Sequence, residues 1–308
     1  MTASPPVEAS WVSLSDISEI ELVILKRMRD VTMGDHRSLS HGSGFDFVGL
    51  RDWQAGDKFS SIDWAQSSLT NFSPLVVREF DQASTATVVA VADISTSTRC
   101  GANGTRVGAA IARAVATLGM SAVFFQDQFG IVTFDEGFEH LGTVRPRTGK
   151  RHIVHCLDSY QTQRGLQEVR RHGSLSTTLG GYLRKASMLP VISDFLFENT
   201  REVLSEFSDL NATNDVFLVM IDSAFAFDVP GVNAGWVEIV DVETNRTRTI
   251  SKNTLARLVE KVRDWQADVR RIAKDFDLDI VEIGIDETKS DLALSEFVAE
   301  RRLRKTTT

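Results

Sequence analysis

Apolar residues along this chain change their spacing twice near the N-terminus, and each change marks a predicted element. After a Ser-, Pro- and Ala-rich leader, which we expect to be disordered, apolar residues recur at helical spacing from Ser15 to about Gly34. Residues 35–84 alternate short apolar pieces with glycine and aspartate turn signals, which is typical of a small β-rich module. At Thr85 the continuously apolar, β-branched run TATVVAVAD indicates a central parallel strand buried on both faces. We therefore predict three parts: a leader and N-terminal helix at 1–34, a small β-rich module at 35–84, and a main domain at 85–308.

The main domain alternates strand-like with helix-like segments, which predicts an α/β fold with a doubly wound, mostly parallel sheet. A polar connection is expected at 161–176 and a hairpin at 235–250, with its turn at Thr244 and Asn245. The other predicted strands are 85–93, 130–135, 138–144, 191–195, 216–222 and 278–284, and the predicted helices are 107–120, 150–160, 178–188, 200–209, 252–275 and 290–305.

Composition and charge limit the kinds of partner that the protein is expected to bind and the cellular compartment in which it is expected to be found. The 308 residues carry a formal charge of -8, which opposes generic binding to a polyanion, so no nucleic-acid partner is expected. A basic cluster at Arg145, Arg147, Lys150 and Arg151 is expected to be an ordinary solvated face. Two cysteines without C-x-x-C spacing suggest neither a disulfide framework nor a zinc site. Without a signal sequence or an apolar run of about 18 residues, the chain is expected to be cytoplasmic with no membrane span.

Oxygen-bearing side chains follow the first strand of the main domain. The strand VVAVAD runs into I-S-T-S-T, which places Asp93, Ser95 and Ser97 within one turn. Ligands of open α/β sheets gather at the carboxyl ends of parallel strands. Asp194 ends a later predicted strand at the same edge, and Thr177 opens the helix before that strand. These five residues predict a shell for Mg²⁺ or Mn²⁺, both of which prefer oxygen ligands.

The same residues have a purely structural interpretation, which stays open at this point. Aspartate and serine after a strand are also good helix N-caps, so D-x-S-x-S alone does not identify a metal site. The later threonine and aspartate, in an order that allows three loops to meet, favour metal binding.

This order of residues resembles a known site. ADISTST, Thr177 and Asp194 are similar to the metal-ion-dependent adhesion site of von Willebrand factor A-type domains, which reads D-x-S-x-S, then T, then D. The resemblance implies a von Willebrand factor A-like fold. It also implies that Ser95, Ser97 and Thr177 bind the metal through hydroxyls, while Asp93 and Asp194 act mainly through water.

The segment upstream resembles a second signature. GSGFDFVGLRDWQAGDKFSSIDWAQSS followed by VVREF is similar to bacterial domain-of-unknown-function family 58, whose G-L-R, G-D and I-D-W motifs precede an A-type domain. The matching positions are Gly49, Leu50, Arg51, Gly56, Asp57, Ile62, Asp63 and Trp64. The family commonly has an arginine before I-D-W and an A-R pair after it, where this chain has Ser60, Ser61, Ser68 and Leu69.

The resemblance implies a partner and a role. Members of this family are typically encoded beside MoxR-type AAA+ ATPases and are thought to act as adaptors in chaperone-like complex assembly. By this analogy the chain is expected to be a non-enzymatic, metal-dependent adaptor whose partner donates a carboxylate to the metal.

Two alternatives remain. A haloacid-dehalogenase-like phosphohydrolase would use Asp93 as nucleophile beside Mg²⁺, but it requires a second aspartate where this chain has Ser95.

In the small module, the tryptophans, with Phe80, are expected to be core and the aspartates to cap turns. A partner-binding face there is the alternative, and it would comprise Arg51, Trp53, Asp57, Asp63 and Trp64.

Overall fold

The chain divides into two compact units. One comprises Met1–Arg27 and Ala86–Thr308, and the other comprises Met28–Thr85. The computed structural model describes residues 11–35, 46–54, 57, 62–69, 71–81, 85–102, 105–183, 185–226, 235–240, 246–284 and 286–306. The predicted disordered leader, the hairpin turn and the motif positions Gly56, Ser60 and Ser61 lie outside these residues, as does the side chain of Phe80.

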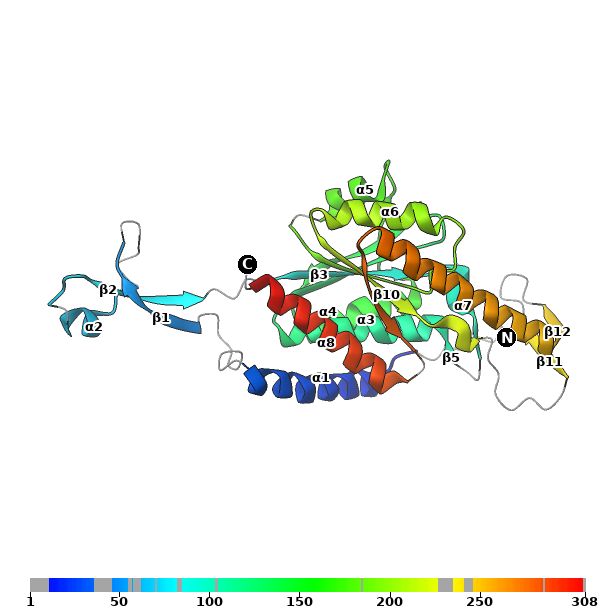
Figure 1. The fold of residues 1–308 in the computed structure, drawn as a ribbon, viewed down its shortest axis with the longest axis horizontal. Coiled ribbons are helices and arrows are strands. Elements are labelled where there is room, and N and C mark those ends of the chain that lie inside the picture. Colours follow the sequence, from blue (N-terminus) through cyan, green and yellow to red (C-terminus); the bar gives the residue numbers. More distant parts are fainter. Residues whose placement is uncertain are drawn as a thin grey trace, which may run out of the picture. The chain divides into compact units, whose positions relative to one another are not determined.

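The larger unit is built on a mixed, mostly parallel sheet (Figure 1). Within the described residues this sheet has seven strands in the order β13-β10-β9-β3-β6-β7-β8. The first five of these run parallel, whereas β7 pairs antiparallel with both β6 and β8. The strands are β3 (Thr87–Asp93), β6 (Gln128–Phe134), β7 (His140–Arg147), β8 (Gln167–Arg170), β9 (Met188–Ser193), β10 (Asp215–Ile221) and β13 (Asp279–Ile283).

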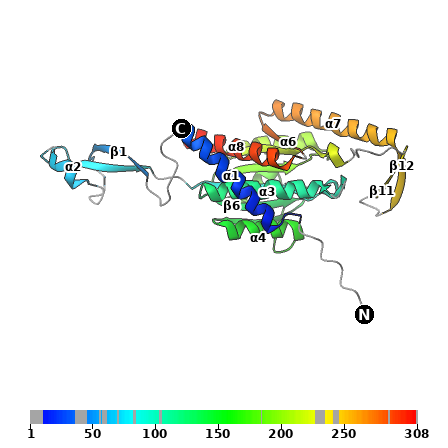
Figure 2. The ribbon, with the colours of Figure 1, turned by 90° about the horizontal axis from the view of Figure 1, so that it is seen from below.

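Helices cover both faces of this sheet, which confirms the predicted α/β architecture (Figures 1 and 2). One face carries α5 (Leu175–Tyr182), α6 (Thr200–Asn211) and α7 (Lys252–Asp275), whose apolar residues join those of the strands in one core cluster. The other face carries α3 (Val107–Phe124), α4 (Lys150–Thr162), α8 (Glu287–Thr306) and the first turns of α1 (Leu14–Asp35). Strands β3, β9 and β10 are buried along nearly their whole length, as their continuous apolar sequences require.

Helix α3 is the central helix of its face. Its small side chains allow close approach, because a Cβ on Gly119 would lie 2.4 Å from Cγ2 of Ile153 in α4. Within the described residues, α3 is also the one helix long and apolar enough to cross a membrane, with 72% of it buried inside the protein. Burial of this extent is typical of a core helix.

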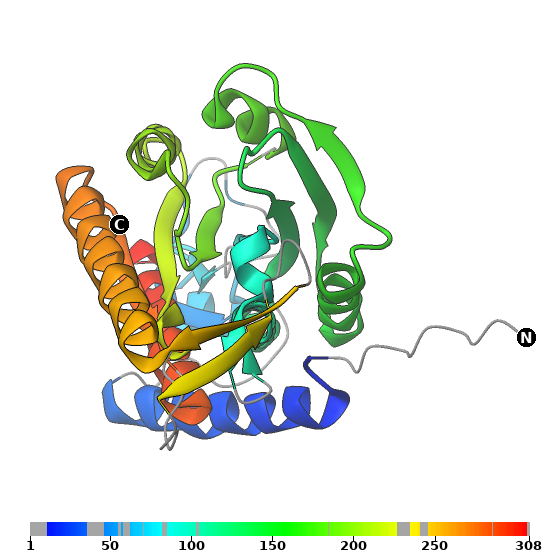
Figure 3. The same cartoon turned by 90° about the vertical axis from the view of Figure 1, so that its right-hand side faces the viewer.

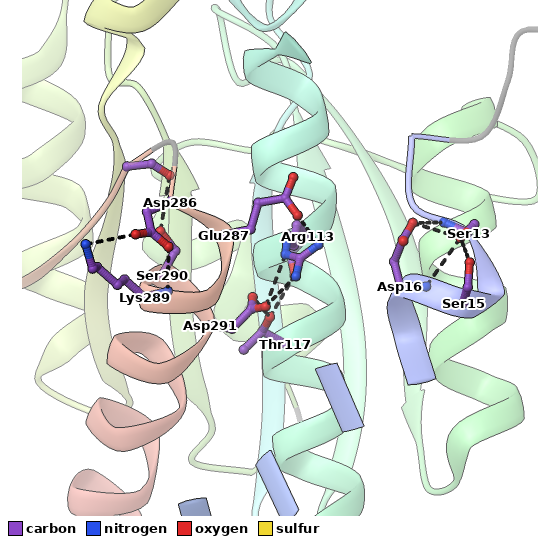
Figure 4. A network of polar contacts seen from close by, with 11 residues as sticks. Ser13, Ser15, Asp16, Arg113, Thr117, Asp286, Glu287, Lys289, Ser290 and Asp291 are labelled. Atoms are coloured by element: carbon purple, nitrogen blue, oxygen red, sulfur yellow. Dashed lines mark hydrogen bonds and ion pairs between the residues drawn. The ribbon is translucent and has the colours of Figure 1, made fainter. Parts of the chain in front are cut away.

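A buried ion pair joins α3 to α8 (Figure 4). Arg113 donates two hydrogen bonds to Oδ2 of Asp291, at 2.8 and 3.1 Å, and also pairs with Glu287. Thr117 donates to the other carboxylate oxygen of Asp291 at 2.7 Å. Beside them, Ser13 and Asp16 cap the start of α1 through reciprocal hydrogen bonds.

A hairpin of β11 (Trp236–Val240) and β12 (Thr247–Ser251) leads directly into α7, as predicted (Figure 3). Ser251 caps that helix by accepting a hydrogen bond from the backbone N–H of Thr254. Shorter elements in the unit are η2 (Thr96–Arg99), β4 (Gly101–Ala102), β5 (Thr105–Arg106) and η3 (Ser223–Ala226).

The smaller unit contains β1 (Asp46–Asp52) paired antiparallel with β2 (Val76–Asp81), and the short helix α2 (Trp64–Leu69). Ile62 and Val77 are buried in it. Trp53 is partly buried, but Trp64 is 58% exposed, so the prediction that it belongs to the core was wrong. Trp64 is the first residue of α2 and follows Asp63, whose carboxylate accepts hydrogen bonds from the backbone N–H groups of that first turn.

Two segments of the larger unit differ from the sequence-based prediction. The predicted polar connection at 161–176 contains β8, a short edge strand whose side chains are mostly exposed. The helix predicted at 178–188 lies at Leu175–Tyr182, because Ser174 caps it by accepting a hydrogen bond from the Thr177 N–H. The residues that follow already enter β9 at Met188.

Candidate functional site

The candidate site lies where the order of strands reverses. From β3 the chain adds β6, β7 and β8 on one side, and then returns to place β9 on the other side of β3. In open α/β sheets, this switch point is where ligands bind, outside the carboxyl ends of the strands. Asp93 is the last residue of β3, and Asp194 directly follows β9. The topology therefore brings two carboxylates, far apart in sequence, to the same crevice.

Asp93 is fully buried and both of its carboxylate oxygens accept hydrogen bonds. The backbone N–H of Ser95 donates to Oδ1 at 2.6 Å, and the hydroxyl of Ser193 donates to Oδ2 at 2.5 Å. Burial raises the pKa of Asp93 above its ordinary value, although these hydrogen bonds oppose the shift. Asp93 is thus fixed in orientation by two donors.

Asp194 is 1% exposed, and only one of its two carboxylate oxygens accepts hydrogen bonds from the described residues. Its Oδ1 accepts hydrogen bonds from the Ser97 hydroxyl at 3.0 Å and from the Leu196 N–H at 3.2 Å. Its Oδ2 is buried without a hydrogen-bond partner in the described residues. Burial, together with the negative charge of Asp93, raises the pKa of Asp194 to about 7. The two carboxylates therefore repel each other in a site where a cation would be favoured.

The two serines connect the aspartates. The hydroxyls of Ser95 and Ser97 lie 3.1 Å apart, and Ser97 continues to Asp194. Thr98 donates to the carbonyl of Ser95 at 2.7 Å and so closes the turn of η2. The D-x-S-x-S segment thus directs one carboxylate and two hydroxyls toward Asp194.

Thr177 lies at the exposed start of α5. Its hydroxyl is 2.9 Å from the hydroxyl of Ser174, the capping residue of that helix. Among the residues that the structure describes, no hydrogen bond joins Thr177 to Asp93, to the two serines of the turn or to Asp194. The geometry therefore brings four of the five predicted residues together and leaves Thr177 in a capping network.

Four residues around the site were not predicted from the sequence. Ser193 bridges Asp93 and the N–H of Phe195, and Tyr160 donates to the backbone oxygen of Asp93 at 2.9 Å. Glu136, after β6, accepts from the N–H of Thr96 at 3.1 Å, and its charge adds to the raised pKa of Asp93. Trp265 of α7 donates to the carbonyl of Phe195 at 2.8 Å. The polar Ser193 inside an apolar strand was the one visible sequence signal.

The oxygen atoms at this site are suitable ligands for a hard divalent cation. Carboxylate and hydroxyl oxygens are the ligands that Mg²⁺ and Mn²⁺ prefer, and Oδ2 of Asp194 is a buried acceptor with capacity to spare. Asp93, Ser95, Ser97 and Asp194 could hold such an ion directly or through water. No group of three His, Cys, Asp or Glu side chains suited to a metal occurs in the described ranges, so a thiolate- or imidazole-rich site is not indicated there.

In the smaller unit, three of the predicted partner-binding residues, Arg51, Asp57 and Asp63, form local contacts. Arg51 binds Asp57 through two hydrogen bonds of 2.8 Å, and Asp57 also accepts from the N–H of Gln54. The hydrogen bond from Arg51 lowers the pKa of Asp57 to about 2. Asp63 accepts from two backbone N–H groups at the start of α2, which confirms the expected capping role of the aspartates. Trp64, the first residue of α2, has an exposed side chain.

These features define an α/β protein with a carboxylate-and-hydroxyl site at the switch point of its sheet. The chain belongs to the family described as "Protein of unknown function DUF58", whose model matches residues 49–273. The resemblance to this family seen in the sequence motifs is thereby confirmed.

Other comparisons are more distant. No curated protein matches this chain. Two solved structures are similar to it over 70% of its length: the conserved hypothetical protein BatB from Bacteroides thetaiotaomicron, and an aerotolerance-related membrane protein from Bacteroides fragilis NCTC 9343 with multiple mutations to serines. The first has 15% identity, a TM-score of 0.40 and 98% of its own chain covered. The second has 11% identity, a TM-score of 0.42 and 99% of its own chain covered.

Proposed function

We propose that this protein is a non-enzymatic adaptor that binds a partner protein through a divalent metal ion held at Asp93, Ser95, Ser97 and Asp194. The observation that carries the proposal is the buried pair of carboxylates at the switch point, one of which has an oxygen without a hydrogen-bond partner among the described residues. Two such groups are costly to bury together as anions unless a cation compensates them. The proposal includes a von Willebrand factor A-like fold for the larger unit.

The serine hydroxyls determine what such a site can do. Neutral hydroxyls supply oxygen ligands without neutralising the cation, so the metal would retain affinity for a further anionic ligand. A glutamate or aspartate carboxylate from a partner would supply that ligand, which couples partner binding to metal binding. By family resemblance, a MoxR-type AAA+ ATPase is the partner we expect, in a chaperone-like or complex-assembly role at a cytoplasmic location.

The arrangement around Asp93 supports an adaptor over a phosphohydrolase. A nucleophilic carboxylate must reach its substrate with a free oxygen, whereas both oxygens of Asp93 accept hydrogen bonds and the side chain is fully buried. Ser95 stands where that class of enzyme requires a general acid.

Calorimetric titration with Mg²⁺ or Mn²⁺ tests the metal site. We expect binding in the wild type and its loss in Asp93→Ala and Asp194→Asn. Asp222→Ala is the matched control, since Asp222 follows the neighbouring strand β10 but is exposed and accepts a hydrogen bond from the Ala224 N–H at the start of η3. Equal heats in wild type and both site variants would refute the site.

A pull-down from native lysate tests the partner. The bait is the full chain, with Mg²⁺ in one sample and chelator in the other, and the Asp194→Asn variant is the control. Recovery of an AAA+ ATPase that depends on both the metal and Asp194 is the expected result. Recovery of the same proteins by the variant, or in chelator, would show that the metal does not mediate binding. Hydrolysis of an aryl phosphate that disappears in Asp93→Asn would favour the enzyme instead.

A further inference from the structure

A second cleft lies at the opposite edge of the sheet from the carboxylate site. It has a volume of about 580 Å³ and is lined at its base by Thr87 and Gln128, the first residues of β3 and β6. Other walls come from β7, β8 and the segment from α5 to the start of β9, including Arg145, Gln167, Tyr182 and Lys185. This volume is in the range typical of small-molecule sites, roughly 300–1,000 Å³.

A β-bulge shapes one wall of this cleft. Between two ladder positions, β7 contains one residue more than β6, since Phe129 pairs with Arg147 but Ile131 pairs with Val144. Both Arg145 and Pro146, which form the bulge, line the cleft. Opposite them, Gly130 permits the close approach, because a Cβ there would lie 2.8 Å from the carbonyl oxygen of Val144. Bulges are found next to functional sites, where they redirect a side chain.

The charge of the cleft is opposite to that of the chain. Its described lining contains two cations, Arg145 and Lys185, and no acidic side chain, although the protein as a whole carries a formal charge of -8. Neither cation forms an ion pair within the described residues. Gln128 and Gln167 add side-chain amides that can donate hydrogen bonds. The basic cluster noticed in the sequence thus contributes Arg145 to a concave site.

Apolar groups complete the lining. Val169, Leu183 and the ring of Tyr182 give the cleft an apolar wall beside its cations. Burial raises the pKa of Tyr182 to about 12, so its phenol is neutral at physiological pH. The site thus combines two positive charges with a surface suited to an organic ligand.

We infer that this cleft binds a small organic molecule carrying a phosphate or carboxylate group, with Arg145 and Lys185 as the residues that recognise the anion. Arg145 provides the planar donor pair that suits either kind of oxyanion, and Lys185 provides a second charge from the segment between α5 and β9. The inference does not depend on the proposed metal site.

Titration calorimetry with inorganic phosphate and, separately, with citrate tests the inference, on the full chain with chelator present so that the metal site cannot contribute. We expect binding of at least one probe in the wild type, and weakening of about tenfold in Arg145→Gln and in Lys185→Gln. Binding of phosphate alone or of citrate alone would identify the type of anion.

Arg147→Gln is the matched control, because this arginine is exposed on the same strand and does not line the cleft. We expect it to bind the probes as the wild type does. Absence of binding of both probes to the wild type, or equal weakening in the control and in the two cleft variants, would overturn the inference. Circular dichroism of each variant establishes that the fold is retained.

Discussion

The indole N–H of Trp265 in α7 donates a hydrogen bond of 2.8 Å to the carbonyl oxygen of Phe195, the residue immediately after Asp194. Phe195 has a φ of 55°, in the left-handed region that non-glycine residues rarely adopt. Its N–H is also held, by the hydroxyl of Ser193 at 2.8 Å. The loop carrying Asp194 is thus fixed from two sides, which keeps the carboxylate beside Ser97.

Trp265→Phe should lower metal affinity without removing a ligand. The substitution keeps an aromatic ring but deletes the N–H that holds the loop, and loss of such outer contacts typically costs about tenfold in affinity. Titration with Mg²⁺ measures the change. Trp236→Phe is the control, since Trp236 is 66% exposed on β11. Equal affinities in both variants would contradict a positioning role for Trp265.

Ser193→Ala should destabilise the protein more than a serine-to-alanine substitution that removes a single hydrogen bond. It removes the donor to Oδ2 of Asp93 and the acceptor for the N–H of Phe195, both buried, at a cost of about 1–3 kcal/mol. Urea unfolding in chelator measures the loss. In Ser208→Ala, the control, one partly buried hydrogen bond to the carbonyl of Phe276 is lost, so the effect should be smaller. A larger effect in the control would be inconsistent with the bridging role.

Arg113→Met should be strongly destabilising, because Asp291 would remain buried without its cation (Figure 4). Removing one member of a buried pair typically costs about 3–5 kcal/mol. The double variant Arg113→Met with Asp291→Leu should recover much of the loss, since no buried charge is then left unpaired; Glu287, the other partner of Arg113, has a side chain that is 64% exposed. Urea unfolding of the three proteins measures this coupling. Additive losses in the double variant would show that the pair does not act as a unit.

Gly119→Ala should destabilise the protein although alanine is the better helix former. The added methyl would meet Cγ2 of Ile153, a branched side chain with little freedom to move, and overpacking of this kind costs about 1–3 kcal/mol. In an Ile153→Ala background the same change should be neutral or stabilising. Gly180→Ala in α5 is the control, because its Cβ would meet nothing within 4 Å. Thermal unfolding should show opposite shifts for the two glycine variants.

The central strands and the long helices were predictable because local sequence alone fixes their burial. Between Val88 and Ala92 every residue of β3 is apolar, and α7 follows a serine that caps it. Strand β8 was not predictable, since its sequence QEVR carries one apolar residue and its pairing with β7 is made by the backbone at a sheet edge. The exposure of Trp64 likewise depends on tertiary packing that its local sequence does not encode.

The residues of the candidate site likewise include some that the sequence predicts and some that only the structure reveals. Asp93, Ser95 and Ser97 are neighbours in sequence, and Asp194 ends a recognisable strand, so strand-end reasoning was sufficient to find them. Trp265 lies 70 residues after Phe195 in the chain, and it contacts the site through a hydrogen bond to the backbone oxygen of that residue. Because a backbone acceptor leaves no residue-type signal, such a contact becomes visible only in three dimensions.

The two cysteines should differ sharply in reactivity. Burial raises the pKa of the Cys156 thiol to about 12, so roughly one such thiol in ten thousand is ionised at pH 8, and the thiolate is the nucleophile. Cys100 is partly exposed beside η2. A thiol-reactive disulfide reagent at pH 8 should therefore label one cysteine per native chain and two after unfolding in urea. The Cys100→Ser variant should resist labelling until it unfolds, because Cys156 is fully buried in the native protein. Rapid labelling of that variant in its native state would show that Cys156 is not held in the core.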